Sequence, residues 1–398
     1  MKKIKYILMF LLAFSAFSCE EETIRGQFPV DGIAPQVVSN VEVKNIKGGT
    51  ILTYKVPTDL DLLYIEAEYE VNNGKRRLKK VSSFVNNMEL RGFAKATQAQ
   101  VKLTSVDKSK NRSESVTVDI SPEDSPIFEI KESIQLETSF GGFKIAWENP
   151  LQEQIAVRTL AKSEDGKFLP TADAFFGNDA KVNTAVRGQK GVETEFAIFV
   201  EDIYENQSDT LFYTTTPLRE DFLDASIWKE MTLCSDFRYS QYNKGWSTVL
   251  DGKKTDDLIY YLERNGTDEP ISFTFDLGVE VQLSRFKYWA RPRFPYDLHH
   301  ARFFEVWGTN DADVAVGDPC SFDGWTLLMN GESVKPSGLD YGSVTEQDVQ
   351  AAHEGEEFEF PVDGVPSVRY LRYRCLETWS KSNKLNVEEL DIWGEIKE

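Results

Sequence analysis

A ten-residue pattern occurs twice in the first half of the 398-residue chain, and this repeat limits the fold more than any other feature. Residues 48–57 read GGTILTYKVP and residues 141–150 read GGFKIAWENP, so both glycines, the aromatic residue and the proline coincide at an offset of 93 residues (141 against 48). Four later landmarks recur at an offset of 95 (202 against 107): Asp107, Asn111, Ser113 and Pro122 match Asp202, Asn206, Ser208 and Pro217. A period of this length indicates a duplicated domain, because solenoid repeats are about 20–50 residues long.

Apolar and polar residues alternate within each module as they do in β-strands. Between positions 63 and 71 every second residue is apolar, namely Leu63, Ile65, Ala67, Tyr69 and Val71, which directs one face of the strand into a core. Asn73-Gly74 then provides a hairpin signal, because both residues tolerate a positive φ. Short alternating strands in about 100 residues favour an antiparallel sandwich. We therefore predict β-sandwiches over residues 36–122 and 123–217, and their arrangement resembles tandem Ig/fibronectin type III-like modules, which usually act as spacers.

The charge balance excludes one class of partner. The chain has 45 Lys and Arg residues against 65 Asp and Glu residues, a formal charge of −20. Nucleic-acid binding depends on clustered cations that neutralise phosphates, so we expect no nucleic-acid partner. No run of 18 apolar residues follows the N-terminal segment, which excludes a protein with several membrane-spanning helices.

The first 18 residues are typical of a bacterial signal peptide. Three lysines precede the apolar run at residues 7–14, which is too short to span a bilayer. Ala16 and Ser18 stand just before Cys19, and this triad resembles a lipoprotein processing box, so residues 1–18 are the predicted signal peptide and Cys19 the predicted lipidated residue. Acyl chains on Cys19 would anchor the chain to a membrane. The alternative is an ordinary secretory signal with a chance cysteine.

Residues 19–35 form the predicted acidic linker after the lipidated cysteine. The run Glu20-Glu21-Glu22 resembles the surface-export signal of lipoproteins in some Gram-negative groups, so we expect an outer-membrane, lipid-anchored protein that faces the cell exterior. A solvated linker with periplasmic retention is the alternative. Of the remaining cysteines, Cys234, Cys320 and Cys375, at least one must be a thiol, and no CxxC spacing suggests zinc.

In the last third, residues 218–398, the segments in which apolar and polar residues alternate are longer. Its landmarks are LDG (250–252), FTFDLG (273–278), FEVWGTND (304–311), RYLR (369–372) and EELDIWG (388–394). Together and in this order they resemble the coagulation factor 5/8 type C (discoidin-like, galactose-binding-like) family, which implies a jelly-roll β-sandwich. The predicted fold class is therefore all-β, with two Ig/fibronectin III-like sandwiches followed by a discoidin-like carbohydrate-binding domain. Residues 331–359 form an acidic insertion that we expect to be a mobile loop.

The discoidin-like resemblance implies a structural Ca²⁺ beside the LDG turn. Asp251 matches the turn aspartate of the family and Glu389 the acidic residue of the last strand. Glu388 would offer its carbonyl, and Thr255 or Asp256 would close the loop. Calcium takes oxygen ligands of this kind. The alternative is that Asp251 caps a turn and that Glu389 is a solvated strand residue.

Ligands of discoidin-like domains bind to loops at one end of the barrel, which correspond here to residues 238–246, 291–300 and 377–386. In the second loop two prolines reduce the entropy lost on binding, and Arg, His and Asp supply hydrogen bonds to sugar hydroxyls. Aromatic rings would provide a flat platform for a sugar ring. The candidate ligand-binding residues are Trp246, Arg291, Arg293, Tyr296, Asp297, His300 and Trp379.

The order of lipobox, tandem spacers and terminal module resembles surface lipoproteins of Sus-type polysaccharide-utilisation systems. The resemblance implies a non-catalytic protein that captures a polysaccharide or oligosaccharide beside an outer-membrane transporter complex. HExxH, G-x-S-x-G, P-loop and G-x-G-x-x-G motifs are all missing from the sequence, so we expect no enzyme. An adhesion or structural lipoprotein that docks a protein is the alternative, and a glycoside hydrolase with two unrecognised carboxylates is a third interpretation.

Overall fold

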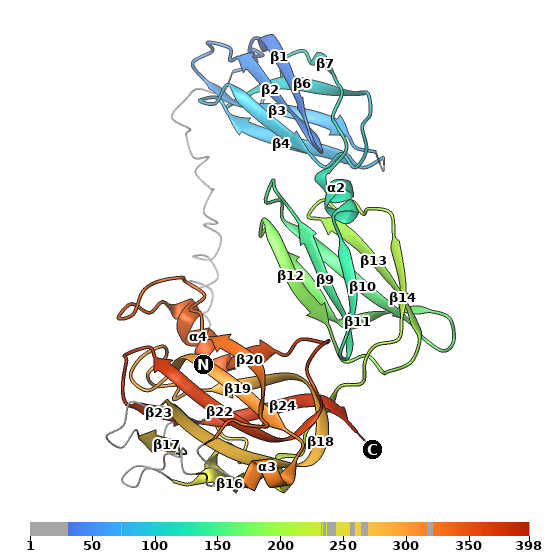
Figure 1. Cartoon of the computed structure of the whole chain (residues 1–398). Coiled ribbons are helices and arrows are strands. Elements are labelled where there is room, and N and C mark those ends of the chain that lie inside the picture. Colours follow the sequence, from blue (N-terminus) through green and yellow to red (C-terminus); the bar gives the residue numbers. More distant parts are fainter. Residues whose placement is uncertain are drawn as a thin grey trace, which may run out of the picture.

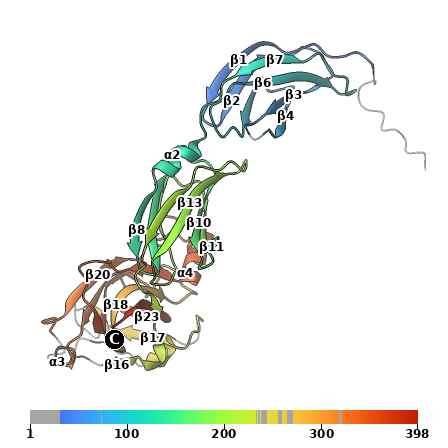
Figure 2. The same ribbon diagram turned by 90° about the vertical axis from the view of Figure 1, so that its right-hand side faces the viewer.

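The computed structural model describes residues 31–72, 74–231, 233, 236, 244–254, 259–263, 270–316 and 321–397. These residues form three β-rich units that follow one another along an elongated molecule (Figures 1 and 2). The fold class is confirmed, since two β-sandwiches precede a jelly-roll domain. Residues 1–30, with Cys19 and most of the linker, lie outside the described residues, as do Cys234, Thr255, Asp256 and Cys320.

The first unit packs a three-stranded sheet against a four-stranded one, with every strand pair antiparallel. The sheet orders are β1 (Ser39–Ile46)–β2 (Gly49–Lys55)–β5 (Asn87–Arg91) and β4 (Arg76–Ser82)–β3 (Leu62–Glu70)–β6 (Ala99–Asp107)–β7 (Val116–Ile120). Four of the five alternating apolar residues are buried, but Leu63 is 41 % exposed. The register of β3 on β6 shifts between Leu62 and Tyr64, so Leu62 enters the core in place of Leu63.

The second unit repeats this architecture after a short helix, α2 (Pro126–Glu132). Its sheet orders are β12 (Lys181–Val186)–β9 (Gly142–Glu148)–β8 (Gln135–Ser139) and β11 (Phe168–Gly177)–β10 (Ile155–Lys162)–β13 (Thr194–Asp202)–β14 (Leu211–Thr215). Phe143, Ile145, Phe196 and Ile198 are fully buried between the sheets. The alternating patterns of these two strands therefore face one core, as the sequence predicts.

The repeated glycines have the same structural reason in both units. Gly48 and Gly141 have φ of +69° and +64°, the left-handed region that glycine adopts without strain. A Cβ on Gly49 would lie 2.2 Å from the Leu90 carbonyl oxygen, and one on Gly142 would lie 2.0 Å from that of Val186. Neighbouring strands thus approach too closely for any side chain at the second glycine.

The repeated Asp, Asn and Ser residues close the same turn in each unit. The Asn111 amide and side chain both donate to Asp107, at 2.8 and 2.9 Å, and Asn206 donates to Asp202 at 3.0 and 2.9 Å. Both asparagines thus tie the end of a long central strand to the loop that follows it. The repeated residues therefore form the same two turns in both units, a glycine turn and an Asx turn.

The third unit is a jelly roll built around one long strand, β18 (Ile271–Trp289). Its first half pairs with β22 (Val368–Thr378) and β16 (Lys229–Met231), and its second half pairs with β24 (Glu389–Ile396) and β21 (Glu356–Glu359). The remaining elements are β15 (Asp221–Phe222), η1 (Ala225–Ile227), η2 (Trp246–Val249), β17 (Tyr260–Glu263), β19 (Ala301–Thr309), α3 (Ala312–Val316), β20 (Thr326–Glu332), α4 (Glu346–Glu354) and β23 (Lys384–Val387). A register shift between Asp276 and Val281 lets β18 change partners.

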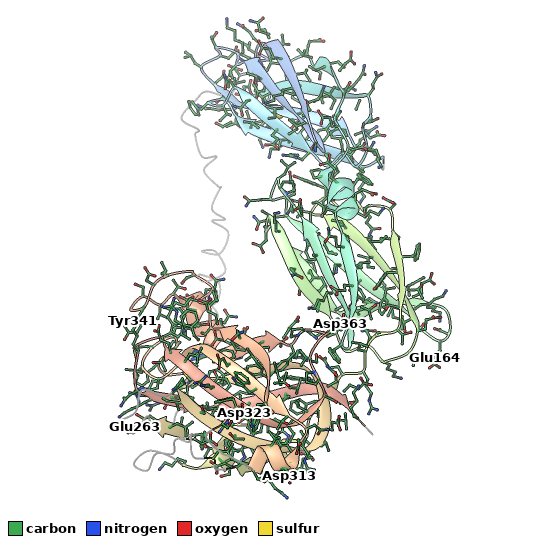
Figure 3. The ribbon with its side chains drawn as sticks, viewed as in Figure 1. Glu164, Glu263, Asp313, Asp323, Tyr341 and Asp363 are labelled. Carbon is green, nitrogen blue, oxygen red and sulfur yellow. The ribbon has the colours of Figure 1, made fainter. Side chains whose placement is uncertain are left out.

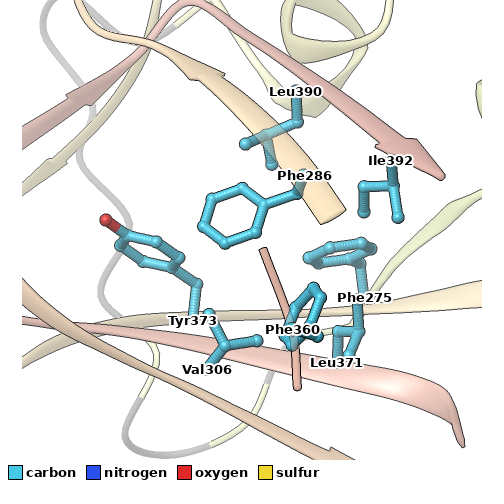
Figure 4. Close-up of a pocket in the computed structure, with 8 residues that line it drawn as sticks. All are labelled: Phe275, Phe286, Val306, Phe360, Leu371, Tyr373, Leu390 and Ile392. Carbon is cyan, nitrogen blue, oxygen red and sulfur yellow. The ribbon is translucent and has the colours of Figure 1, made fainter. Parts of the chain in front are cut away.

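The core between the jelly-roll sheets is almost entirely apolar. It contains one small cavity of about 20 Å³, lined by Phe275, Phe286, Val306, Phe360, Leu371, Tyr373, Leu390 and Ile392 (Figure 4). A space of this size holds about one water molecule, and its apolar lining makes it a packing gap with no room for a sugar. Cys375 is a buried thiol in the same core.

Charged side chains connect each unit to the next. Between the first and second units, Arg91 donates to Glu153 at 3.2 Å and Arg77 donates to the Tyr204 carbonyl oxygen at 3.1 Å. Between the second and third units, Glu220 lies between Arg187 and Arg285, at 3.1 and 3.2 Å, and its side chain is only 6 % exposed. Desolvated pairs of this kind hold a defined geometry better than exposed ones.

The acidic insertion, residues 331–359, differs from the mobile loop expected from its sequence. It contains α4 and β21, and β21 pairs with β18. Thr345 and Asp348 form a reciprocal capping box at the start of α4. Burial raises the pKa of Asp348, but hydrogen bonds from Thr345 and Ser337 outweigh this effect and lower it to about 2.

Candidate functional site

The loop over residues 291–300 has a strained and firmly held backbone. Tyr296 and Leu298 adopt positive φ values of 52° and 44°, which non-glycine residues rarely do. The Tyr296 amide donates to Nδ1 of the buried His300 at 3.0 Å, and His300 Nε2 lies 2.6 Å from Glu356 Oε2. Because Nδ1 accepts, Nε2 must carry the proton that it donates to Glu356. Glu356 also accepts from Ser333 at 2.7 Å, so the insertion fixes this loop.

The next loop, residues 377–386, is tied to the first. Ser380 donates its hydroxyl to the Leu298 carbonyl oxygen, and His299 Nδ1 lies 2.8 Å from Ser382 Oγ. Burial and the nearby cations Lys384 and Arg291 lower the pKa of His299, so the ring is neutral at pH 7. The two predicted ligand loops therefore form one connected end of the barrel. Of the remaining predicted loop, residues 238–246, the part from 238 to 243 lies outside the described residues.

Three of the predicted sugar platforms are buried, which corrects the expectation that they are open to solvent. Trp246 is 8 % exposed and packs edge-to-face on Tyr260 in the main core. Tyr296 and Trp379 are 1 % and 6 % exposed and pack edge-to-face on each other. Tyr296 and Trp379 lie in loops, as predicted, whereas Trp246 begins a short 3-10 helix, η2 (Trp246–Val249). The insertion covers Tyr296 and Trp379, because Ala352 of α4 belongs to the same cluster.

The charged candidates in this loop are more accessible. Arg293 is exposed, and Arg291 and Asp297 are half-buried. Both guanidinium groups lie near the ring of Phe294, at 5.0 Å for Arg291 and 5.7 Å for Arg293. Asp297 Oδ1 accepts from the Leu298 amide at 2.6 Å and from the Tyr341 hydroxyl at 2.9 Å. Of the predicted residues, these three present polar groups at the surface, whereas His300 at 3 % exposure positions the loop.

Tyr341 was missed at the sequence level, because residues 331–359 have no regular pattern. Two glycines flank its turn, Gly338 and Gly342, with φ of +68° and +90°. A buried lysine, Lys335, donates from Nζ to the carbonyl oxygens of Asp340 and Ser343 at 2.8 Å each, and lies 4.7 Å from the centre of the Trp379 ring. The paired glycines were the signal of a tight turn that displays the residue between them. Figure 3 shows Tyr341 at the outer edge of the third unit.

Acidic side chains gather where the LDG turn meets β24. The Gly252 amide donates to Glu389 Oε2 at 3.1 Å, and Glu389 is 3 % exposed. Burial, followed by the charges of Asp391 and Asp251, raises the pKa of Glu389 to about 8, against an ordinary value of 4.5. Glu388 is fully buried. Carboxylate oxygens are hard donors of the kind that Ca²⁺ takes, and the Gly252 contact places the Glu389 carboxylate beside the LDG turn, where the discoidin-like resemblance implies the ion.

A nearby lysine partly compensates this negative charge. Lys254 Nζ lies 3.9 Å from Asp391 Oδ2 and 3.9 Å from the centre of the Trp289 ring. A second acidic group lies in the first unit, where carboxylate oxygens of Asp31, Asp61 and Asp107 lie within 4.8 Å of one another. Asn111 donates to both Asp31 and Asp107, so hydrogen bonds already satisfy much of this second group.

No helix among the described residues is long and apolar enough to cross a membrane. Three families, each a domain of unknown function, match successive parts of the chain: DUF4959 over residues 35–122, DUF5126 over residues 123–226 and DUF5000 over residues 250–394. A search of the curated proteins found no match.

Solved structures resemble the chain at different levels. SusE-like protein BT2857 is 30 % identical, covers 68 % of this chain and 99 % of its own, and superposes with a TM-score of 0.44. CBM32-3 from a family 31 glycoside hydrolase of Clostridium perfringens is 18 % identical over 44 % of this chain and 95 % of its own, with a TM-score of 0.32. The family 32 CBM of C. perfringens NanJ, solved with galactose, is 15 % identical, covers 44 % of this chain and 98 % of its own, and superposes with a TM-score of 0.30. By the identity and coverage of the first of these, the chain belongs to the family of SusE-like proteins.

Proposed function

We propose that the protein is a non-catalytic, cell-surface glycan-binding lipoprotein that captures polysaccharide or oligosaccharide for a polysaccharide-utilisation system. One observation carries the proposal: the barrel end formed by residues 291–300 and 377–386 is locked in shape while Arg293 and Asp297 remain accessible. A binding loop that is ordered beforehand loses little entropy when it captures a ligand. Membership of the SusE-like family supports a role in glycan capture.

In this proposal the predicted residues divide into two groups. Arg291, Arg293 and Asp297 contact the glycan, because guanidinium and carboxylate groups hydrogen-bond sugar hydroxyls. The other group is buried and holds the loops that present those side chains in position; it consists of Tyr296, His300, Trp379 and Trp246. The two sandwich units act as spacers that hold the third unit away from the membrane, where Cys19 carries the lipid anchor and an outer-membrane transporter is a partner.

The test is calorimetric titration of the full chain with a panel of neutral and acidic polysaccharides, together with an assay for released reducing sugar. We expect binding to at least one polysaccharide without hydrolysis. Hydrolysis of any member of the panel would overturn the non-catalytic assignment, and binding to none would overturn the proposal as a whole. Arg293→Ala should weaken the binding by about tenfold, whereas Lys181→Ala, an exposed cation of the second unit, should leave it unchanged.

We also propose that the buried acidic turn binds a structural Ca²⁺. Asp251 and Glu389 would supply carboxylate oxygens and Glu388 its carbonyl, and Thr255 or Asp256 would close the loop. The ion would supply positive charge that offsets the burial of these acids, and it would fix the loop without taking part in chemistry.

A second candidate function rests on the apolar surface of the insertion. Val334, Leu339 and Val344, all in the insertion, are 63 %, 45 % and 43 % exposed, and an apolar patch that they form together would favour docking of a protein. Capture of a defined protein partner by the wild type, but not by a Val334→Ser, Leu339→Ser double variant, would favour this adhesion role. Competition by a sugar would contradict it.

A further inference from the structure

Tyr341 is unusual among the tyrosines and tryptophans of this protein that the structure describes. Of the tyrosines and tryptophans that the structure describes, it alone is exposed, with 49 % of its surface accessible, and all others are half-buried or buried. Four phenylalanines are more exposed than Tyr341, so exposure alone does not mark a site; Tyr341 differs in that its ring is joined to a predicted ligand loop. Two of the three rings that the sequence offered as sugar platforms, Tyr296 and Trp379, lie beneath the insertion that carries Tyr341.

The position of Tyr341 is fixed on both sides of its turn. The ammonium group of Lys335, itself 2 % exposed, bridges the carbonyl oxygens of Asp340 and Ser343, the residues one before and two after the tyrosine. The Tyr341 hydroxyl donates to Asp297 Oδ1 at 2.9 Å, which joins the insertion to the predicted ligand loop. A ring held at both its backbone and its hydroxyl loses little conformational freedom when a ligand settles on its face.

Asp297 retains capacity for a ligand beside this ring. Both of its hydrogen bonds to described residues use Oδ1, from Tyr341 and from the Leu298 amide. Oδ2 has no partner among the described residues and can accept a hydroxyl proton. The carboxylate lies at the hydroxyl end of the ring, so a sugar lying on the face of Tyr341 has this acceptor at its edge. Asp340, next to Tyr341, adds a second negative charge at the exposed surface.

We infer that Tyr341 and Asp297 form a composite sugar subsite, in which a pyranose ring stacks on Tyr341 and donates a hydroxyl to Asp297 Oδ2. The subsite rests on the proposed glycan-binding function and specifies it further. Stacking uses the apolar C–H face of a sugar, and the two carboxylates repel an acidic one. The ligand class is therefore a neutral glycan, and uronate-rich polysaccharides are disfavoured at this position.

The experiment measures the affinity of the full chain and its variants for the best neutral polysaccharide of the panel and for polygalacturonate. Tyr341→Ala should weaken binding to the neutral glycan by about tenfold or more, and Tyr341→Phe by no more than about threefold, because phenylalanine keeps the ring and loses only the hydroxyl. Asp297→Asn should lower the affinity for the neutral glycan. It should also reduce the difference between the affinities for the neutral glycan and for polygalacturonate, because the variant has lost a negative charge. Phe84→Ala, which removes a 96 % exposed ring from the first unit, is the matched control.

The outcomes separate this inference from the function on which it rests. If the wild type binds no polysaccharide, the proposed function fails and the subsite with it. If the wild type binds and Tyr341→Ala binds equally well, the subsite is wrong while the function stands. Equal losses in Tyr341→Phe and Tyr341→Ala would show that the hydroxyl matters and the ring does not, and tighter binding of polygalacturonate would overturn the neutral class. Urea unfolding midpoints of the variants close to that of the wild type exclude a folding defect.

Discussion

Glu356 and Glu357 are neighbours in β21, and their carboxylates serve different parts of the third unit. Glu356 accepts from His300 at 2.6 Å and from Ser333 at 2.7 Å, whereas Glu357 accepts from Arg285 at 2.9 Å. Successive residues of a strand point to opposite faces, so one short strand reaches both the ligand loop and the contact with the second unit. Arg285 in turn pairs with Glu220 at that contact. The insertion therefore lies between the candidate site and the spacer.

His300→Ala should destabilise the third unit and weaken glycan binding. The substitution leaves the Tyr296 amide and a buried Glu356 oxygen without their partner, which costs about 2–3 kcal/mol in the free energy of unfolding. Urea denaturation measures this cost, and calorimetry with the bound polysaccharide measures the affinity, which we expect to fall by about tenfold. His353→Ala, at an exposed histidine of α4, is the control. Equal stability of the two variants would contradict the positioning role.

Glu389 predicts a specific pH dependence of stability in the absence of calcium. The pKa of this buried carboxyl is raised to about 8 in the folded state from an ordinary value of 4.5, so the folded state binds the proton more tightly than the unfolded chain. Stability should therefore fall as the pH rises from about 4.5 to about 8, by about 2–4 kcal/mol. Thermal melts in EDTA across this range measure the slope, and Glu389→Gln should flatten it. Glu395→Gln, which removes a more exposed acid of β24, should not.

Calcium should reverse this trend. If the ion binds the ionised acids, millimolar Ca²⁺ raises the melting temperature most at pH 8, where the carboxyls have lost their protons. Magnesium at the same concentration is the control, because it demands a smaller and more rigid ligand set. A melting temperature that neither Ca²⁺ nor EDTA changes in the wild type would refute the proposed calcium site.

Glu220→Ala should loosen the connection between the second and third units. Arg187 and Arg285, whose side chains are 17 % and 12 % exposed, would lose the carboxylate between them and keep their contacts with Glu359 and Glu357, so we expect a cost of about 2 kcal/mol. We expect calorimetric unfolding to separate into distinct transitions and small-angle scattering to show a broader distribution of dimensions. Glu164→Ala, at an exposed hairpin labelled in Figure 3, should change neither. An unchanged scattering profile for Glu220→Ala would mean that other contacts hold the units together.

Cys19→Ser should abolish lipid attachment. The prediction depends on the sequence before and after Cys19, which lies outside the described residues. Metabolic labelling with a palmitate analogue and fractionation of the membrane should show a labelled, membrane-bound wild type and an unlabelled variant. Labelling that persists in Cys19→Ser would contradict the lipobox assignment. Cleavage of the wild type by protease added to intact cells would indicate display on the outer surface, and protection from the protease would indicate periplasmic retention.

The strand patterns that depend on near neighbours could be predicted well. Alternation in β3, β9 and β13 follows from the two-residue period of a strand, and these strands do face their cores. Leu63 was placed wrongly because the register shift beside it depends on the pairing of β3 with β6, a contact between distant segments. The strand β21 within the insertion was not predicted for the same reason, because it forms by pairing with β18, a distant segment of the chain.

The sequence by itself determined the duplication, the order of the three β units and the polar groups of the 291–300 loop, because glycine turns, Asx turns and strand alternation are local properties of the chain. Only the tertiary structure decided which aromatic rings face solvent. Tyr296 and Trp379 are buried by α4, which begins 50 residues after Tyr296 (346 against 296), and Tyr341 is exposed on the same insertion. Burial is set by what packs against a side chain across the fold, and the residue type alone does not determine it.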